Sequence, residues 1–214
     1  MKQSSLEVFG FPLRIDPSAI ILIVLLFMIY GGNGSQGYSI ALMALAVIIT
    51  SVLVHELGHA FVARRMGLGP IRIVLHGFGG LTHFSKRPNN RQGVVVSLAG
   101  PAAGLALGVL SWVLGDAFVT RESHVLTVIG FQFLIWINLF WSMFNLLPMY
   151  PLDGGQVLWH ALAQKMSPTK ARKRTQQISI VTAVGVGVYA LIHSYIFIAL
   201  ICLFTYSQNA RVHT

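Results

Sequence analysis

His55-Glu56-Leu57-Gly58-His59 is the stretch around which this sequence of 214 residues is organised. It has the H-E-x-x-H spacing of zinc sites. On a helix, residues four apart share one face, so His55 and His59 can bind the same metal ion. Glu56 is then placed to act as general base toward a water molecule that the metal activates. The alternative is a pair of helix histidines satisfied by their neighbours, with an unrelated Glu between them.

The surroundings of this motif are apolar. Apart from the motif, residues Tyr38 to Ala63 are almost wholly apolar, which predicts a membrane-spanning helix that ends at Arg64-Arg65. Ionisable side chains inside such a helix are costly and indicate a functional site. His55 lies nine residues before Arg64. At 1.5 Å per residue, this places it about 13 Å below the cytoplasmic surface, inside a hydrocarbon core about 30 Å thick.

Composition indicates a polytopic membrane protein. The chain is 55% hydrophobic and 10% charged, with a mean hydropathy of +0.70, whereas a soluble domain carries about 25% charged residues. The net charge of +9 could suggest a nucleic-acid partner, but basic loops on the cytoplasmic side explain it better, and no nucleic acid is expected. The single cysteine, Cys202, excludes an internal disulfide framework.

Hydropathy divides the chain into about six predicted transmembrane helices. The first four are expected at 18–30, 38–65, 93–114 and 125–147. The first follows an amphipathic lead of residues 1–17 and is expected to be uncleaved, and an uncharged loop, Gly31 to Gly37, leads to the second. The apolar run Ile178 to Tyr206 is too long for a simple span. It is either two short spans broken near His193-Ser194 or one long tilted helix.

The segment between the second and third predicted spans is rich in glycine and is not expected to be helical. A glycine-rich insert of about 68–90 predicts a membrane-associated β-hairpin with strands at Ile71–Leu75 and Leu81–Phe84. Its strand edge could hold an extended peptide, and an ordinary cytoplasmic hairpin is the alternative. His76 and His83, beside the hairpin turn, are expected to be hydrogen-bonded loop residues.

The small residues of Gly100-Pro101-Ala102-Ala103-Gly104 are expected to serve helix packing rather than chemistry, with Gly104 and Gly108 as a small-xxx-small pair. A basic cytoplasmic loop is expected at about 156–176, with a short helix at Gln156 to Lys165 and a strongly basic run at Lys165 to Arg174. The basic run can either contact anionic lipid headgroups or simply anchor the topology. His160, in this region, is expected to be an ordinary polar residue near a span end.

The distribution of basic residues predicts the orientation. With six spans, 14 of the 15 Lys and Arg residues fall on one side of the membrane, and only Arg121 falls on the other. The positive-inside rule makes the side with 14 cytoplasmic, with both termini inside. With five spans, only Arg211 would change sides, so the charge distribution does not decide whether Ile178 to Tyr206 is one span or two. The expected location is the cell membrane, with a single transmembrane domain over residues 1–214.

A zinc site needs at least a third protein ligand, and Asp153 is the best candidate. It follows the helix-breaking Pro148 and Pro151, where unwound chain can turn a carboxylate into the bundle. Its alternative role is an N-cap for the helix that follows. The other acidic residues besides Glu56 precede the first span or lie in the predicted outer loop, and they are Glu7, Asp16, Asp116 and Glu122.

Two asparagines, Asn138 and Asn145, lie seven residues apart on one helical face. A buried Asn can donate a hydrogen bond to a developing oxyanion, or it can link two helices. Helix linking suits Asn138 better. Asn145 lies closer to Asp153 and is the predicted substrate-facing or oxyanion residue.

Two motifs together resemble the site-2 protease family of intramembrane zinc metalloproteases. They are His55-Glu56-Leu57-Gly58-His59 and the stretch from Asn145-Leu146-Leu147-Pro148 through Pro151-Leu152-Asp153-Gly154-Gly155. Gly79-Gly80-Leu81-Thr82 and Ser97-Leu98-Ala99-Gly100-Pro101 also resemble its small members. The resemblance covers about Phe9 to Ala210. It implies a six-span core and one Zn²⁺ per chain.

By matching positions, the resemblance implies His55, His59 and Asp153 as zinc ligands, Glu56 as base and Asn145 facing the substrate. It implies cleavage of a transmembrane segment of a single-spanning protein, such as an anti-sigma factor or membrane-tethered regulator. Either a regulatory membrane partner or simple access is expected to filter substrates, because the PDZ and CBS domains of many relatives are not seen in this sequence. A membrane metal transporter and a catalytically inactive scaffold are the alternative functions.

Overall fold

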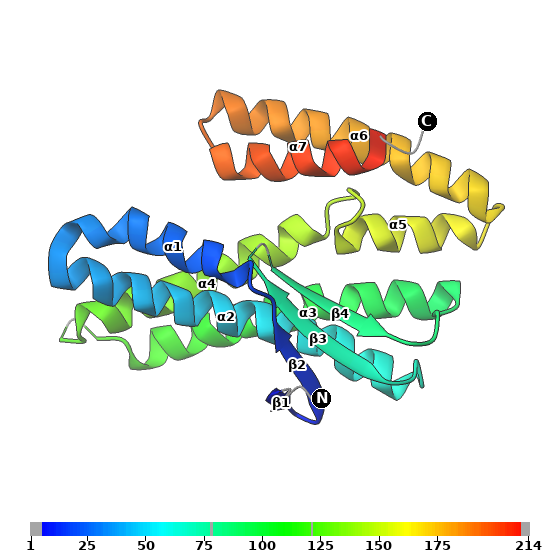
Figure 1. Cartoon of the computed structure of the whole chain (residues 1–214). Coiled ribbons are helices and arrows are strands. Elements are labelled where there is room, and N and C mark those ends of the chain that lie inside the picture. The colour runs from blue at the N-terminus through cyan, green and yellow to red at the C-terminus, as the bar shows by residue number, and fades with distance from the viewer. Residues whose placement is uncertain (1–5, 78, 121, 211–214) are drawn as a thin grey trace. The chain divides into compact units, whose positions relative to one another are not determined.

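The structure is a computed structural model that describes residues 6–77, 79–120 and 122–210 (Figure 1). In these residues, the chain forms seven α-helices and four strands, and the strands come in two pairs, before α1 and before α3. The helices are α1 (Ala19–Tyr30), α2 (Gly34–Arg65), α3 (Asn90–Phe118), α4 (Val125–Asn145), α5 (Asp153–Ala163), α6 (Pro168–Ile192) and α7 (Ile196–Ala210), with a 3-10 turn at Gly31–Asn33. The strands are β1 (Leu6–Val8), β2 (Phe11–Ile15), β3 (Ile71–His76) and β4 (Gly79–Phe84).

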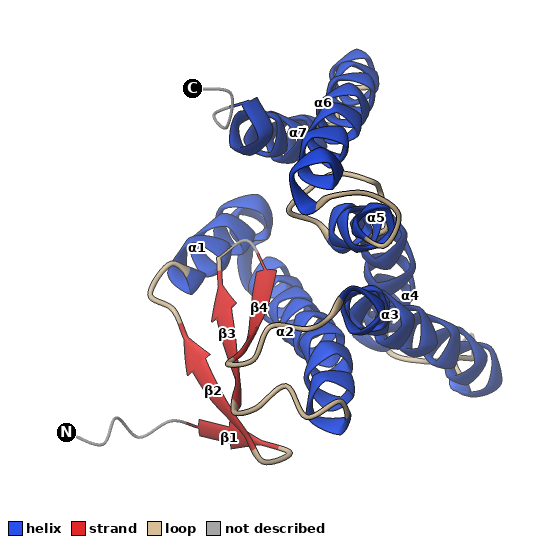
Figure 2. Ribbon diagram, turned by 90° about the vertical axis from the view of Figure 1, so that its right-hand side faces the viewer, coloured by secondary structure: helices blue, strands red, loops and turns tan. Residues whose placement is uncertain are grey.

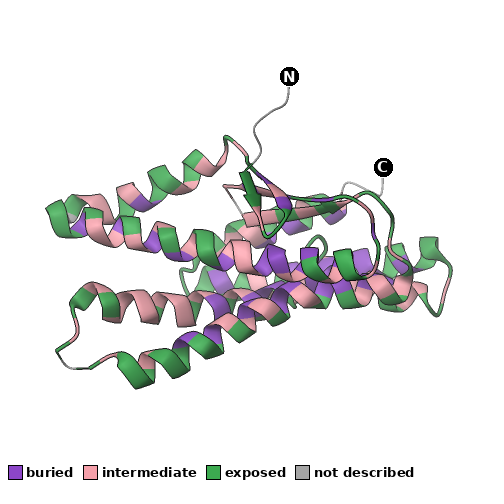
Figure 3. Cartoon of the chain, turned by 90° about the horizontal axis from the view of Figure 1, so that it is seen from below, coloured by how far each residue is buried: buried purple, intermediate pink, exposed green. Residues whose placement is uncertain are grey.

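The helices are those of a multi-pass membrane protein. Four of them, α2, α3, α4 and α6, are long and apolar enough to cross a membrane, and α1 and α7 are shorter apolar helices. Exposed positions recur along α1, α3 and α4 (Figure 3). They include large apolar side chains such as Trp112 and Trp136, as expected of surfaces that face lipid tails rather than water.

The described residues fall into two compact units. The first lies within residues 1–87 and 99–142, and the second lies within 88–98 and 143–214. Both α3 and α4 therefore contribute one segment to each unit.

The first unit contains a four-stranded sheet in the order β1-β2-β3-β4. β2 runs parallel to β3, while β1–β2 and β3–β4 are antiparallel pairs. Figure 2 shows the sheet beside α2, which both β3 and β4 contact. Phe11, Leu13, Ile71, Ile73 and Leu75 are buried at alternate positions, which is the period of a strand with one packed face.

The predicted hairpin is confirmed, but it is half of a larger sheet. Residues 6–15, expected only as an amphipathic lead, form β1 and β2. This short segment offers few residues from which alternation can be recognised. The guanidinium of Arg64, at the end of α2, lies 4.3 Å from the ring centroid of Phe11 and donates to the Phe9 carbonyl. These contacts connect β2 to the motif helix.

Two segments between the predicted spans are largely helical. The uncharged loop Gly31–Gly37 is short, because α2 begins at Gly34. The short helix predicted at Gln156–Lys165 is confirmed as α5, and the basic run after it forms the start of α6, with a connection at 164–167. The Lys, Arg, Gln and Ala residues of this segment favour helix, and Pro168 occupies the first helical position, where proline is tolerated.

The apolar run Ile178 to Tyr206, for which one long helix and a division near His193-Ser194 were both open, is divided after Ile192. In the second unit α6 packs against both α5 and α7. The buried positions of α6 include Ala171, Ser179 and Ala183, small residues that let helices approach closely. Three of the basic residues used in the orientation argument, Lys2, Arg121 and Arg211, lie outside the described residues.

Candidate metal centre

Helix α2 brings His55, Glu56 and His59 together in the first unit. All three side chains are buried. The Nε2 atoms of His55 and His59 lie 3.2 Å apart, and their rings are nearly perpendicular, with centroids 4.9 Å apart. Two imidazole nitrogens this close to each other, inside an apolar helix, suit one shared metal ion better than two independent structural roles.

Helix α3 approaches this face of α2 along small residues. A Cβ at Gly58 would overlap the carbonyl oxygen of Ala99 and lie 2.8 Å from the Cβ of Ala103. Only glycine at position 58 permits this spacing. Farther along the chain, Gly104 and Gly108 face Ser142 and Leu139 of α4 in the same way, which confirms the predicted packing role of that pair.

Gly100 lies directly against the His55 and His59 side chains, which the sequence did not indicate. A Cβ at this position would overlap Nε2 of His59 and lie 2.8 Å from Nε2 of His55. The absence of a side chain therefore leaves space where the two ligand atoms converge. The structure thus corrects the expectation of packing alone and supports the fit of a metal ion to these two histidines.

The carboxylate of Glu56 has a defined partner in β4. The hydroxyl of Thr82 lies 2.7 Å from Oε2 of Glu56 and 3.1 Å from the Glu56 backbone carbonyl. A Cβ at Gly80, two residues earlier, would overlap the Glu56 side chain. Thr82 and Gly80 were not predicted as functional residues, because nothing in the sequence alone indicates that the hairpin reaches Glu56.

Asp153 belongs to the second unit, where it is buried and is the first residue of α5. The N-cap position is Leu152, so the predicted alternative of an N-cap role for Asp153 is wrong. Together, His55, His59 and Asp153 supply the two imidazoles and one carboxylate that could hold a metal ion, and this donor set suits zinc.

The turn before Asp153 is tightly built within its own unit. The backbone N–H of Tyr150 donates to Ser179, and the side chain of Asn209 donates to the Tyr150 carbonyl. A Cβ at Gly154 would overlap the carbonyl oxygens of Leu146 and Leu147, and one at Gly155 would overlap the backbone of Tyr150. The two glycines let the start of α5 pack directly on this turn.

The two asparagines have different surroundings. The side chain of Asn138 donates to Ser51 at 2.9 Å and to the Leu134 carbonyl at 2.8 Å. This links α4 to α2 and confirms the expected helix-linking role. Asn145 is buried at the last residue of α4, and its substrate-facing role stays a prediction. His76 and His83 lie within β3 and β4 rather than in a loop.

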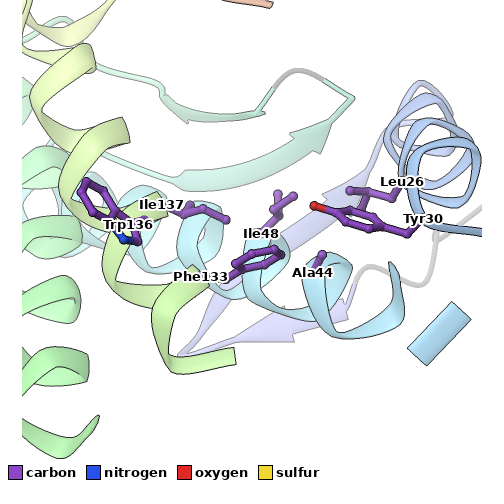
Figure 4. A pocket seen from close by; sticks show the side chains of 7 residues that line it. All are labelled: Leu26, Tyr30, Ala44, Ile48, Phe133, Trp136 and Ile137. Atoms are coloured by element: carbon purple, nitrogen blue, oxygen red, sulfur yellow. The ribbon is translucent and has the colours of Figure 1, made fainter. Parts of the chain in front are cut away.

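A separate apolar pocket of about 390 Å³ lies in the first unit between α1, α2 and α4 (Figure 4). Leu26, Ala44 and Phe133 are among its lining residues, and Tyr30 and Trp136 are its most polar ones. None of the lining residues is a His, Cys, Asp or Glu. The pocket therefore has no ligands for a metal ion and is distinct from the motif face.

These features define a class: a multi-pass membrane protein in which one apolar helix carries a buried glutamate and two histidines that could hold a metal ion. A sequence model of peptidase family M50 matches residues 43–130 and 117–186, about two thirds of the chain. The chain belongs to this family.

Relatives agree with this assignment. A zinc metalloprotease of Methanocaldococcus jannaschii is 27% identical over 209 residues, which cover 96% of this chain and 60% of that protein. Stage IV sporulation protein FB of Bacillus subtilis is 29% identical over 150 residues, 69% of this chain and 50% of that protein. The chain thus spans less than two thirds of the length of these relatives.

The fold is also similar to a solved structure. The site-2 protease from Methanocaldococcus jannaschii superimposes with a TM-score of 0.71 and 25% sequence identity, covering 96% of this chain and 92% of that one. The resemblance stated from the two motifs is thereby confirmed. The donor set of His55, His59 and Asp153 could hold a metal ion and suits zinc, in keeping with the zinc metalloprotease among the relatives.

Proposed function

We propose that this protein is an intramembrane zinc metalloprotease of the site-2 protease type. It cuts a transmembrane segment of single-spanning membrane proteins in regulated intramembrane proteolysis. The observation that carries the proposal is the convergence of His55 and His59, with Glu56 beside them, on a buried point of an apolar helix long enough to span a membrane. Membership of a peptidase family supports the same chemistry.

His55, His59 and Asp153 are the proposed ligands of one zinc ion per chain. Held by these three side chains, zinc would supply Lewis-acid chemistry: it would lower the pKa of a water molecule and polarise the carbonyl group of the substrate. The open space over Gly100 supports the two-histidine half of this ligand set. The Asp153 carboxylate, buried at the start of α5, is the proposed third donor beside the two histidines.

Glu56 is the proposed general base and acid. It accepts a proton from the attacking water and returns it to the leaving amine of the substrate. Thr82 donates a hydrogen bond to one carboxylate oxygen of Glu56. This bond orients the carboxylate and leaves its other oxygen for the proton transfer. Asn145, buried at the end of α4, is proposed to donate to the oxyanion that forms on the substrate carbonyl.

A helical substrate hides its carbonyl groups, so it must unwind locally before it is cut. β4 is the last strand of the described sheet, and the residue that reaches Glu56 lies on it. We propose that the free edge of β4 holds the unwound segment by strand addition. Glycine or proline in the substrate span should then promote cleavage, and their replacement by leucine should reduce it.

The proposed substrates are single-pass proteins such as an anti-sigma factor or a membrane-tethered regulator, with a regulatory membrane partner filtering them. Both termini are proposed to be cytoplasmic. Lys170, Lys173 and Arg174 are exposed on α6 and are proposed to contact anionic lipids of that leaflet. No nucleic acid is involved.

The proposal is tested with the full chain in liposomes that contain candidate single-span substrates. Mass spectrometry of the products should locate a cut inside the substrate span. A chelator should abolish it, and added zinc should restore it. A cut outside the span, or one unaffected by the chelator, would contradict the proposal. Zinc uptake into the vesicles that persists in Glu56→Gln would favour the transporter instead.

A further inference from the structure

His160 is a buried histidine for which the proposed mechanism has no use. It lies on α5, seven residues after Asp153, and is 6% exposed. Residues seven apart on a helix share a face. A contact that fixes His160 therefore also fixes the orientation and position of the α5 face that carries Asp153.

The partner of His160 is Asn90, the first residue of α3 in the same unit. Nδ1 of His160 lies 3.3 Å from Oδ1 of Asn90, and Nδ2 of Asn90 donates to the Ala163 carbonyl at 3.0 Å. Because the Asn90 amide nitrogen is the donor to Ala163, its oxygen is the acceptor toward His160. Burial lowers the pKa of His160, so the imidazole is neutral near pH 7, with a proton on Nδ1 available for this bond.

The fit between the two helices extends to Gly93. A Cβ at this position would overlap the imidazole ring of His160. The ring therefore lies directly on the backbone of α3, and one turn of that helix holds it by a hydrogen bond at Asn90 and by close packing at Gly93.

Helix α3 begins at Asn90, so both contacts with His160 lie in its first turn and within the second unit. They hold the face of α5 that carries Asp153.

We propose that His160 is a positioning residue: with Asn90 and Gly93 it fixes α5 on α3 and thereby holds Asp153 ready to bind the metal. This inference rests on the proposed function, because it assumes Asp153 as the third ligand. His160 touches neither substrate nor metal. Its loss should weaken zinc binding first and reduce cleavage only as a consequence.

The test is zinc affinity, measured on the purified full chain by competition with a chelator of known affinity. Gly93→Ala places a methyl group where the His160 ring lies, and alanine at the same time strengthens α3. We expect zinc binding to weaken about tenfold, the lower end of what loss of a ligand-supporting contact costs. The matched control is Gly185→Ala, a helical position with open space, which should bind zinc like the wild type.

Two further variants separate positioning from general damage to the fold. His160→Gln keeps a side-chain N–H donor and should retain more zinc affinity than His160→Leu. Cleavage by Gly93→Ala should recover at saturating zinc, which a damaged fold would not allow. Should Gly93→Ala not fold, Asn90→Ala replaces it in the same comparison.

The outcomes separate this inference from the function on which it rests. A wild-type protein that binds no zinc would overturn both. Wild-type zinc affinity in Gly93→Ala, or in Asn90→Ala where that variant replaces it, would overturn only the inference. So would equal affinity in His160→Gln and His160→Leu, or cleavage by Gly93→Ala that zinc does not rescue.

Discussion

The two parts of the proposed zinc site are built in opposite ways. His55, Glu56 and His59 lie on one regular helix. The helical period brings the Nε2 atoms of the two histidines to 3.2 Å from each other. Asp153 follows an irregular turn, whose shape depends on close backbone contacts at Gly154 and Gly155. The first part therefore depends on one helical period and on the open space at Gly100, whereas the second depends on the shape of a turn. Variants in each part should separate effects on zinc binding from effects on folding.

Gly100→Ala should have the largest effect. Its methyl group would occupy the place where the histidine nitrogens converge, although alanine suits a helix better than glycine. We expect zinc affinity to fall about 100-fold or more without loss of thermal stability. Zinc content after purification checks this, with Gly185→Ala as control. A fully zinc-loaded Gly100→Ala would show that the two nitrogens do not share the ion.

Gly154→Ala should damage the irregular part. The added methyl group would meet the carbonyl oxygens of Leu146 and Leu147, and overpacking of this kind costs about 1–3 kcal/mol. We expect lower thermal stability together with weaker zinc binding. If stability falls and zinc affinity does not, the turn is needed for folding but not for placing Asp153.

Thr82→Val should affect catalysis alone. It removes the hydroxyl that donates to Glu56, and a hydrogen bond to a charged group contributes about 1.5–3 kcal/mol. We expect kcat for cleavage to fall about tenfold, with zinc affinity unchanged. Thr82→Ser keeps the hydroxyl and should cleave like the wild type. Equal rates in all three proteins would remove Thr82 from the mechanism.

Asn138→Leu should have the smallest effect, because Asn138 links α4 to α2 away from the motif residues. Hydrogen bonds between membrane helices contribute about 0.6 kcal/mol on average. A small decrease in thermal stability, with unchanged zinc affinity and cleavage, is expected. A large loss of activity would instead give Asn138 the oxyanion role proposed for Asn145.

The same contrast explains how much the sequence could predict. The motif helix and the strands of the hairpin follow from local periodicity and composition, and the structure confirms them. The same pattern left open whether the last apolar run is broken near His193, and the structure decides for the break. The ligand pair follows from a four-residue spacing on a helix. Asp153 could be proposed because few other acidic residues were available, but its position as the first residue of α5 could not.

What the sequence could not predict depends on contacts between distant segments. Nothing near Thr82 indicates that its hydroxyl reaches Glu56, and nothing near Gly100 distinguishes a glycine under a metal site from one that only permits packing. The strands at residues 6–15 pair with a segment about 60 residues away. Their own short sequence pattern therefore does not predict that they are strands. Asn90 and His160 are likewise 70 residues apart.

The central claim is that Glu56 performs proton transfer at a zinc site inside the membrane. The direct measurement compares wild type with Glu56→Gln in liposomes, with zinc content and cleavage of a single-span substrate determined on the same samples. The account predicts full zinc occupancy in both and loss of cleavage in Glu56→Gln by about 10²–10⁴-fold, the contribution of general acid–base catalysis. Equal cleavage by both zinc-loaded proteins would contradict it.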